Sequence, residues 1–392
     1  MRILFYLPVI TPWWFDAIVE PLIRCLAREA EVHVLAPVPW SGTGIGEREL
    51  AACADLVAVR WHIFDGDSHP SMRTDAEDRD DIVEFVRALA PDYVLCRSAD
   101  CETVRRFPGT VRHLMEGGAG PLGHPTSWIV LQQEPFDHGL MPEFDADTRA
   151  ELDRRFAPTW NGLRRETAAG EDARRAFRTW AGIPQDRPML LLPLEYEHEE
   201  NFFAAHRVGA ASNAQLLHDW AEAIDDRFFL AATIHPLNEL HSDNSAVTTA
   251  AASHAKRVRL VPSKTQDGRS TTMHLARDAQ GMLIGDTKVY SMGAFFATPM
   301  LRRSRFDTAS WLRTYSDLTD FLPAVADGEA RAADYRDARS WFAFHVANNL
   351  IDPKDPYLTP ATLLAHIDRP IDPARWDAGI ARYRAVAPEQ FQ

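Results

Sequence analysis

The stretch RILFYLPV, residues 2–9, decides the fold class of this chain. It is a short apolar run that closes with a proline, which is typical of a strand buried on both faces of a sheet. Apolar residues at helical spacing follow between residues 15 and 30, and EVHVLA at residues 31–36 is a second apolar run. A strand, a helix and a strand in this order predict a βαβ unit, and therefore a parallel sheet.

The same alternation of strands and helices fills two halves of the chain. It runs to about residue 145 and starts again after Pro188 with MLLLPL. The segment between the halves is charged and rich in Arg, Glu and Ala, which predicts helices. We therefore predict an α/β protein with two doubly wound Rossmann-like domains that face a cleft. Its expected parts are a first domain at residues 1–145, a helical connector at 146–187, a second domain at 188–335, and a terminal helix and tail at 336–392 that pack back on the first domain.

Composition excludes several classes of protein. Of the 392 residues, 46% are hydrophobic and 25% are charged, which are ordinary globular values. The net charge of −14 argues against non-specific binding to nucleic acid or to anionic lipid. The four cysteines form no CxxC pair, and the fifteen histidines have no metal-ligand spacing. We therefore expect reduced, buried thiols in a cytosolic protein and no structural metal.

Familiar catalytic motifs are missing from the sequence. No GxGxxG follows the first strand, and no GxxxxGK[ST] occurs, which disfavours dinucleotide redox chemistry and P-loop phosphoryl transfer. No HExxH or GxSxG occurs either, which disfavours zinc proteolysis and serine hydrolysis.

Two motifs of the second half suit a phosphate. His235 and Pro236 directly follow the apolar run FFLAATI, so the imidazole is expected at the carboxyl end of a strand, where it can pair with a ligand phosphate. A turn with free N–H groups follows the run GMLI and precedes a helix, and such a helix start favours an anion. We assign it four phosphate-binding residues: Gly285, Thr287, Lys288 and Ser291. The competing interpretations are a strand terminator for the first motif and ordinary helix capping for the second.

Acidic residues follow strands in both halves. Glu195 and Glu197 come after MLLLPL, where they can accept hydrogen bonds from ribose hydroxyls or a base amino group, and Glu199 and Glu200 are expected at the surface. Glu116 follows the run VRHLM and precedes two glycines. Its carboxylate is our candidate general base or nucleophile. Glu134 and Asp16 are the alternatives, and a simple turn is the competing interpretation of residues 115–118.

The second half resembles the bacterial capsule-polysaccharide biosynthesis family, which includes Kdo transferases with the two-domain glycosyltransferase-B fold. The resemblance covers residues 185–305 and rests on PLEYE at 193–197, IHPL at 234–237, and IGDT at 284–287 with Ser291. The family has Gln-x-Glu at the first of these places, and here Leu194 or Glu195 replaces the Gln, depending on the register. Bacterial sialyltransferases similarly use His-Pro to hold the phosphate of a CMP-sugar, and residues 115–117 loosely resemble their acidic-Gly motif.

The resemblance implies a glycosyltransferase that moves a sugar from a nucleotide-activated donor, with CMP-Kdo favoured, to a saccharide or glycolipid acceptor. It also implies a cytoplasmic location, with peripheral association at the inner face of a membrane as an option. On this interpretation His235 acts in catalysis together with Glu116. Two alternatives stay open: a nucleotide-sugar epimerase on the same fold, and a catalytically inactive sugar-binding partner subunit.

Overall fold

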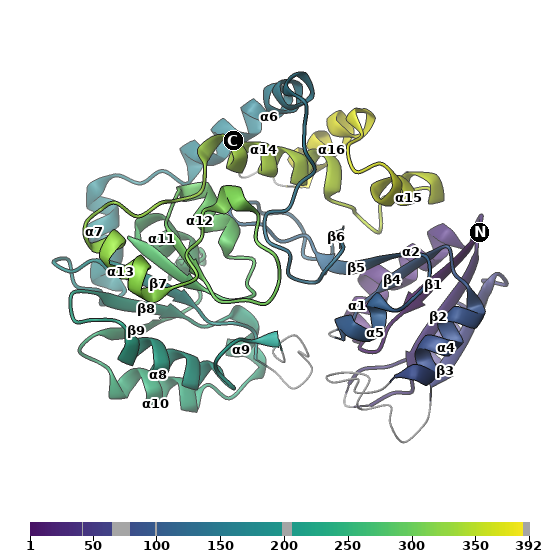
Figure 1. Ribbon diagram of the computed structural model, residues 1–392, viewed down its shortest axis with the longest axis horizontal. Helices are drawn as coiled ribbons and strands as arrows, with labels where there is room; N and C mark the ends of the chain where they lie inside the picture. Colours follow the sequence, from purple (N-terminus) through teal and green to yellow (C-terminus); the bar gives the residue numbers. More distant parts are fainter. Residues whose placement is uncertain (41, 65–78, 99, 198–205, 387–392) are drawn as a thin grey trace. The chain divides into compact units, whose positions relative to one another are not determined.

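The computed structural model describes residues 1–40, 42–64, 79–98, 100–197 and 206–386. These residues form two compact α/β units, shown in Figure 1. Unit 1 consists of residues 1–118, 124–137 and 345–386, and unit 2 consists of residues 119–123 and 138–344. No helix in the described ranges combines the length and the apolar character needed to cross a bilayer.

Unit 1 has a six-stranded sheet with the strand order β3-β2-β1-β4-β5-β6. Its strands are β1 (Arg2–Tyr6), β2 (Glu31–Pro37), β3 (Val59–Phe64), β4 (Tyr93–Cys96), β5 (Thr110–Glu116) and β6 (Ile129–Gln132). Its helices are α1 (Pro12–Trp14), η1 (Phe15–Val19), α2 (Glu20–Leu26), α3 (Glu47–Ala52), α4 (Asp80–Leu89), α5 (Cys101–Arg105), η5 (His345–Asn349), α15 (Pro360–Asp368) and α16 (Pro373–Val386).

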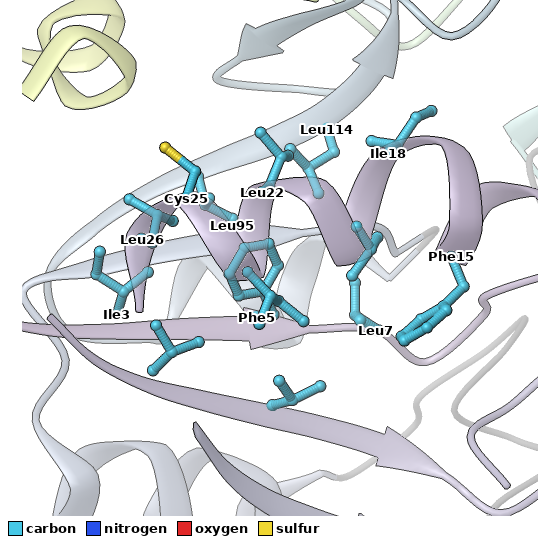
Figure 2. Packing of buried hydrophobic residues seen from close by; sticks show 14 of the residues in the cluster. Ile3, Phe5, Leu7, Phe15, Ile18, Leu22, Cys25, Leu26, Leu95 and Leu114 are labelled. Carbon is cyan, nitrogen blue, oxygen red and sulfur yellow. The ribbon is translucent and has the colours of Figure 1, made fainter. Parts of the chain in front are cut away.

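The central strand β1 is buried on both faces, as its sequence predicts. Ile3, Phe5 and Leu7 belong to a cluster with side chains of η1 and α2 on one face, which Figure 2 shows. Leu4 and Tyr6 belong to a second cluster that includes side chains of α4. Successive residues of a strand point to opposite faces, so one apolar run supplies the core on both sides of the sheet.

Three features of unit 1 differ from the predicted ones. β6 runs antiparallel to β5, with Glu116 opposite Ile129, because no crossover helix separates the two strands. The run DLVAVRW at residues 55–61 predicts a strand that begins at Asp55, but β3 begins four residues later, at Val59. The tail after Asn349 contains the helices α15 and α16, which begin at Pro360 and Pro373. Proline suits the first turn of a helix because its missing N–H would have no partner there.

Unit 2 has a five-stranded parallel sheet with the strand order β11-β10-β7-β8-β9. Its strands are β7 (Met189–Pro193), β8 (Phe229–Thr233), β9 (Val258–Val261), β10 (Gly281–Ile284) and β11 (Met300–Arg302). Its helices are α6 (Ala146–Glu166), α7 (Glu171–Trp180), α8 (Asn213–Ala223), α9 (Pro236–His241), α10 (Ser245–Ser253), α11 (Thr271–Asp278), α12 (Tyr290–Phe296), η4 (Ser310–Leu312), α13 (Leu318–Ala326) and α14 (Tyr335–Phe344).

The helices of unit 2 cover both faces of its sheet. Leu190 and Leu192 of β7 share an apolar cluster with Leu217 and Trp220 of α8. α11 contacts β7 and β8 and lies on the other face with α12 (Figure 1). The fold class is therefore the predicted one: α/β, with two sheets that are largely or wholly parallel.

Candidate functional site

The topology of unit 2 fixes where a ligand is expected. From β7 the chain adds β8 and β9 on one side of the sheet, and then returns to add β10 and β11 on the other. In open α/β sheets, ligands bind outside the carboxyl ends of the strands at the point where the strand order reverses, which here lies between β7 and β10. A small pocket opens at this point. Its lining includes Pro193, Glu195, Arg207, Gly285, Asp286 and Arg303.

Arg207 holds the two acidic residues that follow β7. Its Nε lies 3.1 Å from Glu195 Oε2, and its Nη1 lies 3.1 Å from Glu197 Oε2. Its Nη2 donates to Asn213 Oδ1 at the start of α8. The Arg207 side chain is only 4% exposed, while that of Glu197 is 35% exposed. One buried guanidinium therefore orients both carboxylates at the carboxyl end of β7.

Glu195 also reaches the turn after β10. Its Oε1 accepts a hydrogen bond from the backbone N–H of Asp286 at 3.0 Å. The Asp286 carboxylate is itself buried and pairs with Arg302 Nη2 at 3.0 Å. Burial raises the pKa of Asp286, against the opposing effects of the Ser304 hydrogen bond and Arg302, and Glu195 raises it further. The two sequence motifs after β7 and β10 are thus brought together at the reversal point.

His235 ends the loop after β8 and caps helix α9. Its Nδ1 accepts a hydrogen bond from the backbone N–H of Leu237 at 3.2 Å. Its ring faces Tyr196, with the ring centroids 5.4 Å apart. Asn238 of α9 accepts from the backbone N–H of Glu197 and donates to the carbonyl oxygen of Glu195. The His-Pro motif is therefore attached to the loop that carries the acidic residues.

The turn at residues 287–291 makes mostly local contacts. Thr287 Oγ1 accepts from the backbone N–H of Val289 at 3.3 Å, a contact within the turn, and the N-cap of α12 is Val289, which makes no side-chain cap. The fully buried Ser291 donates its hydroxyl to the carbonyl oxygen of Lys288 at 2.7 Å. Lys288 is half-buried. The Thr287 and Ser291 hydroxyls are thus engaged within the turn, and neither caps α12.

Charges of both signs line the pocket. Besides Arg207, it contains Arg303, whose guanidinium stacks over the ring of Trp220 at 4.0 Å from its centroid. Such stacking fixes the position of a cation whose N–H groups can still donate to phosphate oxygens. The carboxylate of Glu195 can accept hydrogen bonds from hydroxyl groups. The pocket therefore combines the groups needed for a ligand with both phosphate and polyhydroxyl parts.

The reversal point of unit 1 lies between β1 and β4 and has a different composition. Arg97 follows β4, and its guanidinium lies 3.4 Å from the centroid of the Trp14 ring. Its Nη2 lies 3.1 Å from Glu116 Oε1 at the end of β5. Burial lowers the pKa of Arg97, and the Glu116 carboxylate opposes this effect. Glu116 is therefore a partly exposed carboxylate, 30% exposed, oriented by a buried cation.

The two alternative acids occupy other surroundings. Asp16 is exposed and pairs with Arg48 at 3.0 Å. Glu134 accepts from Arg105 Nε at 2.8 Å and lies beside Cys101 and His113. Of the three candidates, Glu116 is the one paired with Arg97, which directly follows β4. Glu199 and Glu200 lie outside the described residues.

The sequence analysis missed residues that organise these sites. Arg207, Asn213 and Asn238 hold the acidic loop of unit 2, and Arg97 and Trp14 hold Glu116 in unit 1. For Arg97 a signal was present, because it directly follows the apolar run PDYVLC at a strand end. For Arg207 no signal was available, because it precedes a helix and follows no strand.

No family model matches the sequence, and the search of curated proteins finds no match. Among solved structures the chain is similar to KpsC of Thermosulfurimonas dismutans, a beta Kdo 2,7 transferase, with 9% identity over 89% of this chain and 92% of that one, at a TM-score of 0.46. It is similar to a glycosyltransferase of Rickettsia africae, with 6% identity over 98% of both chains, at a TM-score of 0.32.

A third similar structure is a UDP-N-acetylglucosamine 2-epimerase homologue of Listeria monocytogenes. It has 12% identity over 95% of this chain and 97% of that one, at a TM-score of 0.32. At such identities and scores these likenesses assign no activity to this chain, so any function has to be argued from its own residues.

Proposed function

We propose that this protein is a glycosyltransferase whose unit 2 binds the nucleotide of an activated sugar at the reversal point between β7 and β10. The observation that carries the proposal is the pocket in which Glu195, Asp286 and the arginines meet. A nucleotide sugar has the matching parts, because its phosphate needs cations and its ribose hydroxyls need acceptors. CMP-Kdo is the favoured donor, on the resemblance of the three strand-end motifs to Kdo transferases.

The proposed reaction forms a bond between an acceptor hydroxyl oxygen and the anomeric carbon, and breaks the bond from that carbon to the phosphate oxygen. The departing phosphate carries negative charge, which His235, Lys288 and Arg303 can stabilise. The acceptor proton passes to a carboxylate, for which we propose Glu116. The acceptor is a saccharide or glycolipid, and the proposed location is cytoplasmic, at or near the inner face of a membrane.

Thermal unfolding with added nucleotides tests the donor site. We expect CMP to raise the melting temperature more than CDP, UDP or GDP. A ligand present at 100 times its Kd adds about 2.7 kcal/mol of stability, which corresponds to a shift of several degrees. If no nucleotide raises the melting temperature at millimolar concentration, the nucleotide-binding proposal is wrong.

The proposed role of His235 in nucleotide binding can be tested separately from its role as the N-cap of α9. His235→Asn supplies another good N-cap for α9 but removes the imidazole, while His235→Ala removes both. We expect both variants to lose nucleotide affinity, and only His235→Ala to lose stability, by about 1 kcal/mol. Unchanged affinity in His235→Asn would remove this residue from the donor site.

Acceptor dependence distinguishes the proposed function from its two alternatives. A transferase consumes the nucleotide sugar efficiently only when an acceptor is present. An epimerase converts the nucleotide sugar without an acceptor, and an inactive subunit binds it without turnover.

A further inference from the structure

A group of titratable side chains lies in unit 1, whereas the proposed nucleotide pocket belongs to unit 2. Cys101 stands at the first position of α5, His113 lies in β5, and Glu134 follows the end of β6. One potential ligand atom from each of these residues lies within 4.8 Å of the other two. We propose that these three residues form a binding site for one divalent metal ion, with zinc as the matching ion.

Burial and sheet pairing fix this group in place. His113 is 2% exposed and Cys101 is 7% exposed. In the β4–β5 pair, His113 lies opposite Cys96, and Cys96 Sγ lies 3.3 Å from His113 Nδ1. A second buried sulfur therefore contacts the imidazole directly. It is placed to orient the ring, which is a common role for a neighbour of a metal-bound histidine.

The donor set matches zinc chemically. A thiolate, an imidazole and a carboxylate are its three usual protein ligands, at about 2.0–2.3 Å from the ion. Tetrahedral binding at these lengths brings ligand atoms to about 3.3–3.8 Å from one another. The three potential ligand atoms lie within 4.8 Å of one another, so the longest separation would have to shorten by about 1 Å on metal binding. Calcium and magnesium prefer sites made of oxygen alone, so this set disfavours them.

Charge balance and access also fit a dication. A Cys101 thiolate and the Glu134 carboxylate would together neutralise a 2+ ion. The Glu134 side chain is 24% exposed and accepts from the half-exposed Arg105, so the group lies near the surface.

The site would join three segments that are separate in the sequence. One ion would hold the start of α5 and the segment after β6 to β5. Arg97, which orients Glu116, directly follows Cys96 in β4. The proposed metal would therefore stabilise the part of unit 1 that carries the candidate base.

Zinc titration of the purified full chain tests this proposal. The chain is first reduced and stripped with a chelator, and zinc affinity is then measured by competition with a chromophoric chelator. We expect one tight equivalent per chain. Cobalt should bind in its place and give a sulfur-to-cobalt charge-transfer band in the near ultraviolet.

Variants separate the site from incidental binding. Cys101→Ser and Glu134→Gln should each weaken zinc binding at least tenfold, and Cys101→Ser should abolish the charge-transfer band. Cys53→Ser is the matched control, because Cys53 is a buried cysteine of the same unit outside the cluster. Glu134→Gln keeps size and is partly exposed, so it should fold even if Cys101→Ser does not. Absence of a tight equivalent in the wild-type chain, or equal affinity in Glu134→Gln, overturns the proposal.

Discussion

Replacing Arg207 with methionine should destabilise unit 2 strongly. Methionine has a similar length but no charge, so it removes the three hydrogen bonds to Glu195, Glu197 and Asn213. The Glu195 side chain is 13% exposed and would lose its paired cation. It would also stay close enough to the buried Asp286 to raise the pKa of that carboxyl. The variant therefore leaves an acidic group largely buried without its counter-charge.

The size of the effect follows from this burial. Removing one partner of a buried ion pair costs about 3–5 kcal/mol, because the remaining charge is desolvated without compensation. Glu197 is about one-third exposed and contributes little to this cost, since solvent screens it. We therefore expect a loss of about 3 kcal/mol. In a unit of this size, that is a drop of about 6–12 °C in melting temperature.

Thermal unfolding followed by circular dichroism measures this loss. Arg227→Met is the matched control, because Arg227 is in the same unit and pairs with Asp225 at 2.8 Å, but with its side chain 59% exposed. The double variant Arg207→Met/Glu195→Gln should recover part of the lost stability, because the orphaned charge is gone. If Arg207→Met and Arg227→Met melt within 2 °C of each other, the buried pair does not stabilise the unit as argued.

Two further predictions concern Glu116 and His138. Glu116→Gln should lower the transfer rate by about 10²–10⁴-fold with nucleotide affinity retained. The control Asp16→Asn should keep a near wild-type rate. A folded Glu116→Gln protein with normal turnover would contradict the assignment. His138 is buried, 2% exposed, and stacks on Tyr290. Burial holds its pKa well below 6.5, so the folded chain keeps this ring neutral while the unfolded chain protonates it. The free energy of unfolding should therefore fall as pH drops below about 6.5, by at most about 1.4 kcal/mol per pH unit for this residue. In urea unfolding at pH 5, His138→Phe should lose less of this free energy than the wild type does.

The sequence predicts the parts of this fold that depend on local apolar pattern. The run at residues 2–9 gives β1, and MLLLPL gives β7, because a strand covered on both faces needs continuous apolar residues. The orientation of β6 depends on the path between β5 and β6, which no local pattern encodes. The prolines after Asn349 have two interpretations, as loop residues or as first residues of helices, and only packing against the sheet decides between them.

The candidate site is predictable to a similar extent. His235, Glu195 and Gly285 follow apolar runs, so their place at strand ends could be inferred from order along the chain. Their partners could not, because Arg207 and Asn238 come from loop and helix positions that meet the strand ends only in the folded unit. The group of Cys101, His113 and Glu134 could not be predicted either. No spacing rule connects the start of α5, a position inside β5 and the segment after β6.

The two reversal points carry different chemistry, and this difference favours different ligands. In unit 2, Arg207 is committed to Glu195 and Glu197, which leaves Arg303 as the lining cation held by an aromatic ring. A pocket with oriented acceptors and such a cation suits a nucleotide. In unit 1, Arg97 is buried between Trp14 and Glu116, so its charge serves to orient one carboxylate. A carboxylate held in place but still exposed suits proton transfer better than phosphate binding, because like charges repel a phosphate. We therefore propose that unit 2 binds the donor and that unit 1 binds the neutral, hydroxyl-bearing acceptor.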